Sequence, residues 1–158
     1  MKTPLIGFAI GLAVLAGGAV VAGSHVDKNV EAAVKARKAH MQLYAYNLGI
    51  LGAMAKEEVP YDAASASAAA GNLAALARMN EGSYWPQGSD SLSMEGTRAL
   101  PDIWDNIDDV LVKAKALTDA SAAMEAAAGT GLDGLKGAMG AVGGACGACH
   151  KAYRQPDS

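Results

Sequence analysis

Apolar residues recur at steps of three and four positions along most of this chain, and no stretch alternates apolar and polar residues at every second position. Such steps are typical of α-helices that bury one face. The longest segment of this kind runs from about Asp27 to Lys56, and Val59-Pro60 ends it. The pattern therefore predicts an all-α protein with a long, amphipathic first helix. The apolar stripe of that helix consists of Val30, Val34, Met41, Tyr44, Leu48 and Leu51.

A second helix is predicted from Asp62 to about Met79, in an alanine-rich segment. Aspartate suits the N-cap position because its carboxylate accepts hydrogen bonds from free N–H groups of the first turn. Residues 83–99 differ in character: they are rich in serine and contain Pro86 and Gly88, so we expect an irregular loop there. This loop would be the longest connection in the fold.

Two further helices follow the loop. The third is predicted to begin at Pro101, which suits a first helical turn, and to run without interruption to about Ala128. Gly129-Thr130-Gly131 ends it, and a fourth helix then runs from about Leu132 towards Arg154. Amphipathic helices joined by short connections and one long one predict an antiparallel four-helix bundle.

The fourth helix is unusually rich in glycine, and each glycine disfavours a helix by up to about 1 kcal/mol relative to alanine. The glycines at every third position form a slowly drifting stripe, where missing side chains predict close approach by another helix or by the edge of a flat cofactor. In the alternative interpretation, part of this segment is a loop before a short final helix. The stripe consists of Gly134, Gly137, Gly140 and Gly143.

The pentapeptide Cys146-Gly147-Ala148-Cys149-His150 is the attachment signature of a c-type haem. Two thiols three residues apart on a helical turn can each form a thioether with one of the two haem vinyl groups. The next residue lies about 100° further round the helix, so its imidazole can reach the iron from the same side. We therefore predict one covalent haem c per chain, with Cys146 and Cys149 as anchors and His150 as the proximal iron ligand.

Two other sites use a Cys-x-x-Cys pair, namely a thioredoxin-like dithiol and half of a structural zinc site. A dithiol of that type follows an early strand, and the chain shows no strand pattern. A zinc site needs further ligands, but the other histidines, His25 and His40, are distant in sequence and no second cysteine pair exists. Both alternatives are therefore weaker than haem attachment.

The N-terminus carries Lys2 and then an uncharged run from Leu5 to Gly23. We interpret residues 1–23 as a secretory signal peptide, cleaved near Ala22-Gly23, and residues 24–158 as the mature domain. A retained membrane anchor is the alternative, because the run approaches the roughly 20 residues that span a bilayer. Haem is attached to thiols on the export side of bacterial membranes, so both features predict a periplasmic protein.

The formal net charge is −3, and removal of Lys2 with the leader makes it −4 (twelve Lys and Arg against sixteen Asp and Glu). The chain has no basic run, so we expect no nucleic-acid partner. No Ser/His/Asp set, carboxylate pair or phosphate-binding glycine loop occurs either. We therefore do not expect an enzyme.

With these motifs the mature chain, over essentially its whole length, resembles the cytochrome c′ family, the class II c-type cytochromes. The terminal motif is highly specific, and the others support it. The shared features are Arg37 followed by Met41, Pro60-Tyr61-Asp62, Trp85-Pro86-Gln87-Gly88, the segment from Leu100 to Trp104, and Cys146 to Arg154 with its Tyr153-Arg154 ending.

The resemblance implies two kinds of sixth coordination position. Low-spin relatives place a methionine of the first helix on the iron, and Met41 stands at that place here. High-spin relatives leave the position open, which permits NO or CO to bind, and Met41 would then only fill the core. We favour Met41 as the distal ligand. The implied function is a periplasmic carrier of single electrons, and the alternative is a five-coordinate cytochrome c′ that binds NO or CO.

The resemblance also implies that Arg37 pairs with a haem propionate, although it could be a plain surface charge. Arg154 is a candidate for a similar contact, and a frayed chain end is its alternative. Tyr44 lies on the inner stripe of the first helix and is expected in the core or against the haem. His40 lies about 100° from Met41 round the helix, so we expect it in solvent or near a propionate.

No motif identifies the partners. The acidic balance suggests periplasmic or membrane redox proteins with a basic docking patch. Family dimers use the outer faces of the first two helices, so the resemblance leaves a homodimer open.

Overall fold

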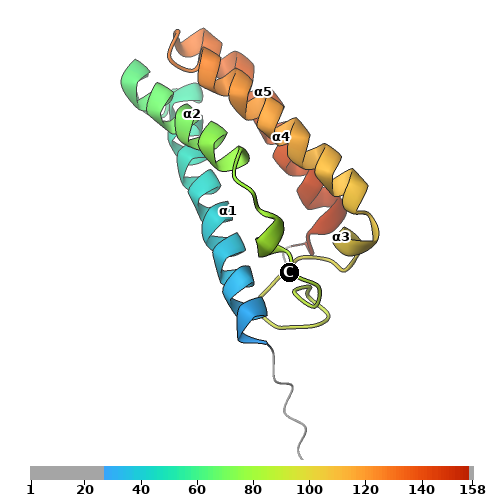
Figure 1. Cartoon of the computed structure of the whole chain (residues 1–158). Coiled ribbons are helices and arrows are strands. Elements are labelled where there is room, and N and C mark those ends of the chain that lie inside the picture. Colours follow the sequence, from blue (N-terminus) through green and yellow to red (C-terminus); the bar gives the residue numbers. More distant parts are fainter. Residues whose placement is uncertain (1–26, 157–158) are drawn as a thin grey trace, which may run out of the picture.

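A computed structural model describes residues 27–156, which form an antiparallel bundle of four main helices (Figure 1). The first two main helices are α1 (Lys28–Ala55) and α2 (Ala63–Ala77), and the last two are α4 (Ile107–Ala127) and α5 (Leu132–Tyr153). Each helix packs against its neighbours in the order α1, α2, α4, α5 and back to α1. The prediction of an all-α four-helix bundle is confirmed.

The predicted signal peptide, residues 1–23, lies outside the described residues. Within residues 27–156, no helix combines the length and the apolar character needed to cross a membrane.

Aspartate carboxylates begin the first two helices. The Asp27 side chain accepts a hydrogen bond from the Asn29 N–H at 2.8 Å, and the Asp62 side chain accepts one from the Ser65 N–H at 2.7 Å. These contacts satisfy N–H groups that have no partner within the helix. The predicted N-cap at Asp62 is therefore confirmed.

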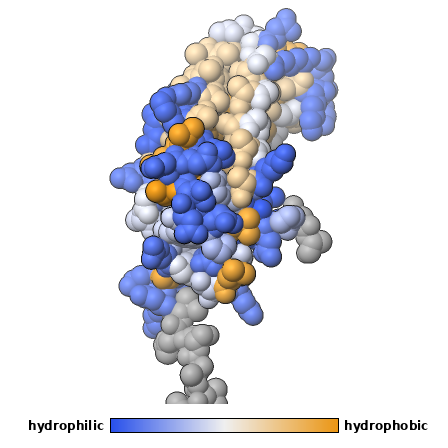
Figure 2. All heavy atoms as spheres, turned by 90° about the vertical axis from the view of Figure 1, so that its right-hand side faces the viewer, coloured by the Kyte–Doolittle hydropathy of each residue, from blue (hydrophilic) through white to orange (hydrophobic). Residues whose placement is uncertain are grey.

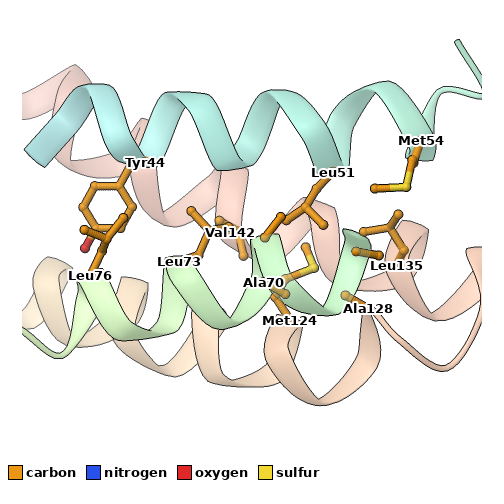
Figure 3. Packing of buried hydrophobic residues seen from close by; sticks show 12 residues of the cluster. Tyr44, Leu51, Met54, Ala70, Leu73, Leu76, Met124, Ala128, Leu135 and Val142 are labelled. Carbon is orange, nitrogen blue, oxygen red and sulfur yellow. The ribbon is translucent and has the colours of Figure 1, made fainter. Parts of the chain in front are cut away.

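A main apolar cluster fills the bundle, as Figure 3 shows for several of its members. Alanines supply the contact face of α2, because small side chains let this helix approach α1 and α4 closely. Burial of the larger side chains contributes roughly 25 cal/mol per Å² of apolar surface removed from water. The members of the cluster are Tyr44, Leu51, Met54, Ala66, Ala69, Ala70, Leu73, Leu76, Met124, Ala128, Leu135 and Val142.

The prediction of one unbroken third helix is wrong. A short helix α3 (Asp102–Asp105) comes first, and α4 begins only after Asn106, whose backbone has φ −129° and ψ 41°. The Asn106 side chain donates to the Asp102 carbonyl at 2.9 Å, so the asparagine closes one helix and turns the chain into the next. Together with the 3₁₀ turn η1 (Gly82–Tyr84), α3 and the loop cover the end of the bundle where the C-terminus lies (Figure 1).

The continuous fourth helix is confirmed, but only one of the four stripe glycines makes the predicted close contact with protein atoms, and approach by the edge of a flat cofactor stays a prediction. A Cβ atom at Gly134 would come within 2.8 Å of the Ala127 carbonyl oxygen, so glycine is required there. At Gly137, Gly140 and Gly143, a Cβ atom would meet nothing within 4 Å among the described residues. These three glycines therefore do not lie in close contact with another helix.

Candidate haem-binding site

The two cysteines lie on the last turns of α5 and join two apolar clusters. Cys146 packs against the main apolar cluster, and Cys149 packs against a second cluster formed by Ala99, Ile103 and Tyr153. Both thiols are free and half-buried. Burial raises the pKa of each thiol, whereas a catalytic dithiol requires a lowered pKa. The site therefore lacks the character of a thioredoxin-like centre.

His150 follows directly and is also half-buried. Burial is the main factor that lowers the pKa of its imidazole, and the positive charges of Arg154 and Arg98 lower it further. A lowered pKa favours the neutral imidazole, which is the form that coordinates a metal ion. The surroundings of His150 thus suit the predicted role of proximal ligand.

Helix α1 contributes Met41 and Tyr44 to the same region. Met41 is half-buried and packs against the main apolar cluster, as Cys146 does. Tyr44 belongs to that cluster, and its hydroxyl has no hydrogen-bond partner among the described residues. Burial chiefly raises the pKa of Tyr44, and the nearby charges of Glu81 and Cys146 add to the shift. Buried hydroxyls without a partner are uncommon in folded proteins.

His40 is not in solvent, so that alternative is wrong, while a place near a propionate stays a prediction. The side chain is 5% exposed, and its Nε2 atom lies 3.1 Å from Glu81 Oε1. Its ring meets Tyr44 edge to face, with 4.9 Å between the ring centroids. Burial raises the pKa of the Glu81 carboxyl, while His40 and a hydrogen bond from the Trp85 side chain oppose that shift. The sequence analysis missed Glu81, because a glutamate in the Asn80-Glu81-Gly82 break carries no signal of burial.

Arg37 is 4% exposed and holds the long loop in place. One terminal nitrogen donates to the Tyr84 carbonyl at 3.3 Å and to Ser89 Oγ at 3.1 Å. The other donates to the Ser89 carbonyl at 2.9 Å and to Thr97 Oγ1 at 2.8 Å. The guanidinium also stacks over the Trp85 ring, 4.4 Å from its centroid. Because both terminal nitrogens have loop acceptors, the predicted propionate contact would need Nε or a rearranged loop, and it stays a prediction.

The C-terminal segment is tied back to the loop rather than frayed. Arg154 pairs with Ala99 in an isolated antiparallel bridge, and the Gln155 N–H donates to the Arg98 carbonyl at 2.8 Å. The side chain of Arg98 returns to the Gln155 carbonyl, with Nε at 3.0 Å. Arg154 itself is exposed, and its propionate contact stays a prediction.

These residues fit a haem better than a bare metal ion. Within residues 27–156, no three His, Cys, Asp or Glu side chains cluster closely enough to hold a metal ion by themselves. The two free thiols lie against the apolar clusters, and the main cluster leaves the Tyr44 hydroxyl without a partner. Together with His150, whose lowered pKa favours the neutral imidazole, these residues are consistent with a cofactor that attaches through thioethers and brings its own iron.

A family model described as Cytochrome C′ matches residues 32–154 of the chain. The chain belongs to the cytochrome c′ family. A cytochrome c-554 from Cereibacter sphaeroides is 47% identical over 130 residues, which cover 82% of this chain and 98% of the relative. The fold agrees with that of a cytochrome c′ from Rhodobacter Spheriodes, with a TM-score of 0.80, 39% identity, and coverage of 84% of this chain and 100% of the other.

A third relative concerns ligands of the iron. A ferrous variant of cytochrome c′ from Alcaligenes xylosoxidans, solved with bound NO, is 32% identical with a TM-score of 0.71. The match covers 84% of this chain and 100% of that chain. As a member of the family, this cytochrome is a c-type haem protein, and Cys146 and Cys149 are consistent with a covalently bound haem c. The dithiol and zinc interpretations are set aside.

Proposed function

We propose that this cytochrome is a periplasmic carrier of single electrons in which His150 and Met41 would both bind the haem iron. One observation supports this best: Met41 of α1 and Cys146 of α5 pack against the same apolar cluster, and α1 and α5 are adjacent helices. When bound, a haem supplies an iron that cycles between Fe(III) and Fe(II).

Each residue would contribute a distinct physical effect. The Met41 thioether favours reduced iron and raises the reduction potential. Two protein ligands keep the coordination number unchanged between oxidation states, which lowers the reorganisation that accompanies each transfer. Cys146 and Cys149 prevent loss of the cofactor. Burial, with the charges of Arg154 and Arg98, lowers the pKa of His150 and so favours the neutral imidazole that would bind the iron.

A second candidate function is the capture of NO or CO at an open distal position. It is favoured by the similarity to the Alcaligenes xylosoxidans variant that was solved with bound NO. In this case Met41 would be an apolar side chain over the vacant face and would coordinate nothing.

Absorption spectra distinguish the two functions. We expect low-spin spectra for the ferric and ferrous wild-type protein, and no change when CO is added to the ferrous form. The variant Met41→Leu keeps the apolar volume but removes the sulfur, so it should become high-spin and bind CO. Met54→Leu is the control, because Met54 lies buried on the same helix at the other end of the cluster and should leave the spectrum unchanged.

Two outcomes would contradict the carrier. Ready binding of CO by the ferrous wild-type protein would support the gas-binding function instead. A low-spin spectrum retained in Met41→Leu would remove Met41 as the ligand.

Export is a separate part of the proposal. The mass of the protein purified from periplasm should correspond to a chain that starts near Ser24 with one added haem. A chain that retains residues 1–23 and sediments with membranes would instead support the anchor.

A further inference from the structure

Large apolar side chains are exposed on the outer face of the first turns of α4. Ile107 is 48% exposed, Leu111 is 60% exposed and Val112 is 66% exposed. Because helical residues are about 100° apart, Ile107, Asp108, Leu111 and Val112 lie within about 140° on one side of the helix. Figure 2 views this side of the molecule and shows apolar spots between hydrophilic side chains in its lower half.

Aspartates lie on and beside this apolar face. Asp102 and Asp105 of α3 and Asp108 and Asp109 of α4 are all exposed, and the sequence has no lysine or arginine between Arg98 and Lys113. Lys113 offsets one of these four charges, because its Nζ lies 3.0 Å from an Asp109 carboxylate oxygen. Lys115 on the same face pairs with Asp119 at 2.6 Å. We call the apolar side chains Ile107, Leu111 and Val112, with these four aspartates, the α4 patch.

The inner side of the same helix turn faces the haem-attachment motif. Val110 and Cys149 both pack against the second apolar cluster. The Tyr153 hydroxyl donates to Asp109 Oδ2 at 2.5 Å, which ties the end of α5 to the start of α4. A helix with its side chains is about 10 Å thick, so the α4 patch and the thioether position of Cys149 are separated by roughly one helix.

We propose that the α4 patch is the docking surface for a protein redox partner whose contact face is basic around an apolar centre. This inference rests on the proposed electron-carrying function, since only a carrier needs a partner beside its haem. A central apolar contact with a charged rim is the usual anatomy of such interfaces. The rim steers the approach of the partner, and its effect weakens as salt concentration rises.

Charge argues against two other occupants of the α4 patch. A second copy of this chain in a two-fold contact would bring this negatively charged patch against an identical one, and the two would repel each other. A membrane surface carries anionic headgroups and would repel them as well. A positively charged protein is therefore the occupant that the patch fits.

The test uses the ¹⁵N-labelled ferric holoprotein and unlabelled ferric mitochondrial cytochrome c, a basic protein with an apolar haem edge, as the probe. With both proteins oxidised, amide chemical shifts report binding without electron transfer. We expect the largest shifts in residues 102–113 and a dissociation constant that rises steeply between about 10 and 150 mM salt.

Matched variants separate the patch from the rest of the surface. The double variant Asp105→Asn/Asp108→Asn should weaken binding by about three- to tenfold at low salt, and Leu111→Ser should weaken it by about fivefold. Asp133→Asn, at the start of α5 and the far end of the bundle, and Leu43→Ser, on the diagonally opposite helix, should each change affinity less than twofold.

Three outcomes would overturn the docking proposal. These are no binding at low salt, shifts that map to another face, or equal losses in the patch and control variants. None of them concerns the spin state or CO binding, so the docking proposal can fail while the carrier function stands. Conversely, CO binding by the wild-type protein would contradict the carrier even if the probe binds at the patch.

Discussion

The two ends of the bundle are packed by different chemistry. At the end far from the haem motif, Met54, Ala128 and Leu135 meet in a compact apolar contact (Figure 3). At the haem end, two buried polar side chains form a polar framework instead, with Arg37 bound to loop oxygens and His40 beside Glu81. The far end is therefore closed by apolar side chains of the protein, whereas the haem end combines buried polar side chains with the haem-attachment motif.

The two ends also differ in how polar atoms are satisfied. At the far end, the Tyr61 hydroxyl donates to the Ala128 carbonyl at 2.8 Å. At the haem end, the Tyr44 hydroxyl has no partner among the described residues. Buried polar groups are nearly always paired, so the unpaired Tyr44 hydroxyl is expected to cost stability. The Ser121 hydroxyl of α4 is another buried group without a partner among the described residues.

The largest expected effect concerns the far end. Leu51 is fully buried, so Leu51→Ala should lower the free energy of unfolding by about 3 kcal/mol through lost apolar contact and a cavity. Urea unfolding of the holoprotein, followed by circular dichroism, measures this loss. Leu43→Ala on the same helix is the control, because Leu43 is 51% exposed and its loss should stay below about 0.5 kcal/mol. If Leu51→Ala also changed the haem spectrum, the far end and the haem end would not be independent of each other.

A smaller loss is expected when the polar framework of the haem end is cut. Arg37→Ala leaves the Ser89 carbonyl and hydroxyl without their donor and should cost about 2 kcal/mol in the same assay. Arg37→Lys should recover only part of this, because an ammonium cannot reproduce the planar contacts of a guanidinium.

Arg78→Ala is the matched control for the framework. Arg78 pairs with Glu125 at 3.2 Å on the surface, where such a pair contributes less than about 1 kcal/mol. If Arg78→Ala and Arg37→Ala destabilise the protein equally, the buried framework has no special role.

Removal of the hydroxyl should change the free energy of unfolding in opposite directions at the two tyrosines, Tyr61 and Tyr44. Tyr61→Phe removes a paired hydroxyl and should lower the free energy of unfolding by about 1 kcal/mol. Tyr44→Phe removes an unpaired buried hydroxyl, so stability should rise by up to about 1 kcal/mol. Thermal and urea unfolding of both holoproteins measure the difference. A clear loss in Tyr44→Phe would mean that the bound cofactor supplies a partner for its hydroxyl.

The smallest effect concerns pH at the haem end. The hydrogen bond to Asp109 is the main factor that raises the pKa of Tyr153 to about 12, and the same bond is the main factor that lowers the pKa of Asp109. The raised tyrosine pKa contributes stability below about pH 10 that is lost as pH rises towards 12. The lowered aspartate pKa contributes stability above about pH 4 that is lost as pH falls through the folded-state pKa.

In the variant Tyr153→Phe, the unfolding midpoint should depend less on pH, both in the acid range and in the alkaline range. Ultraviolet titration provides a direct check, because Asp109→Asn should return the ionisation of Tyr153 towards the ordinary value of a tyrosine. An unchanged titration in Asp109→Asn would show that the two side chains are not coupled in solution.

Much of the fold was predictable because its signals are local. The apolar stripe of α1, the carboxylate at Asp62 and the Gly129-Thr130-Gly131 ending each act within a few residues. The Cys146 to His150 motif was equally readable, since its geometry is set within one helical turn. The break at Asn106 was missed because asparagine also occurs within helices. The hydrogen bond from its side chain to the Asp102 carbonyl, which ends the helix here, is not visible in the sequence pattern.

The sequence by itself therefore determined the main helices and the haem-attachment motif, because both depend on neighbours in the chain. Only the tertiary structure decided that His40 is buried against Glu81, that Arg37 holds the loop, and that most of the stripe glycines touch no other helix. The first two of these outcomes depend on contacts between residues some 40 to 60 positions apart. Burial and pairing across such separations are set by how the helices pack, and periodicity along one helix does not encode them.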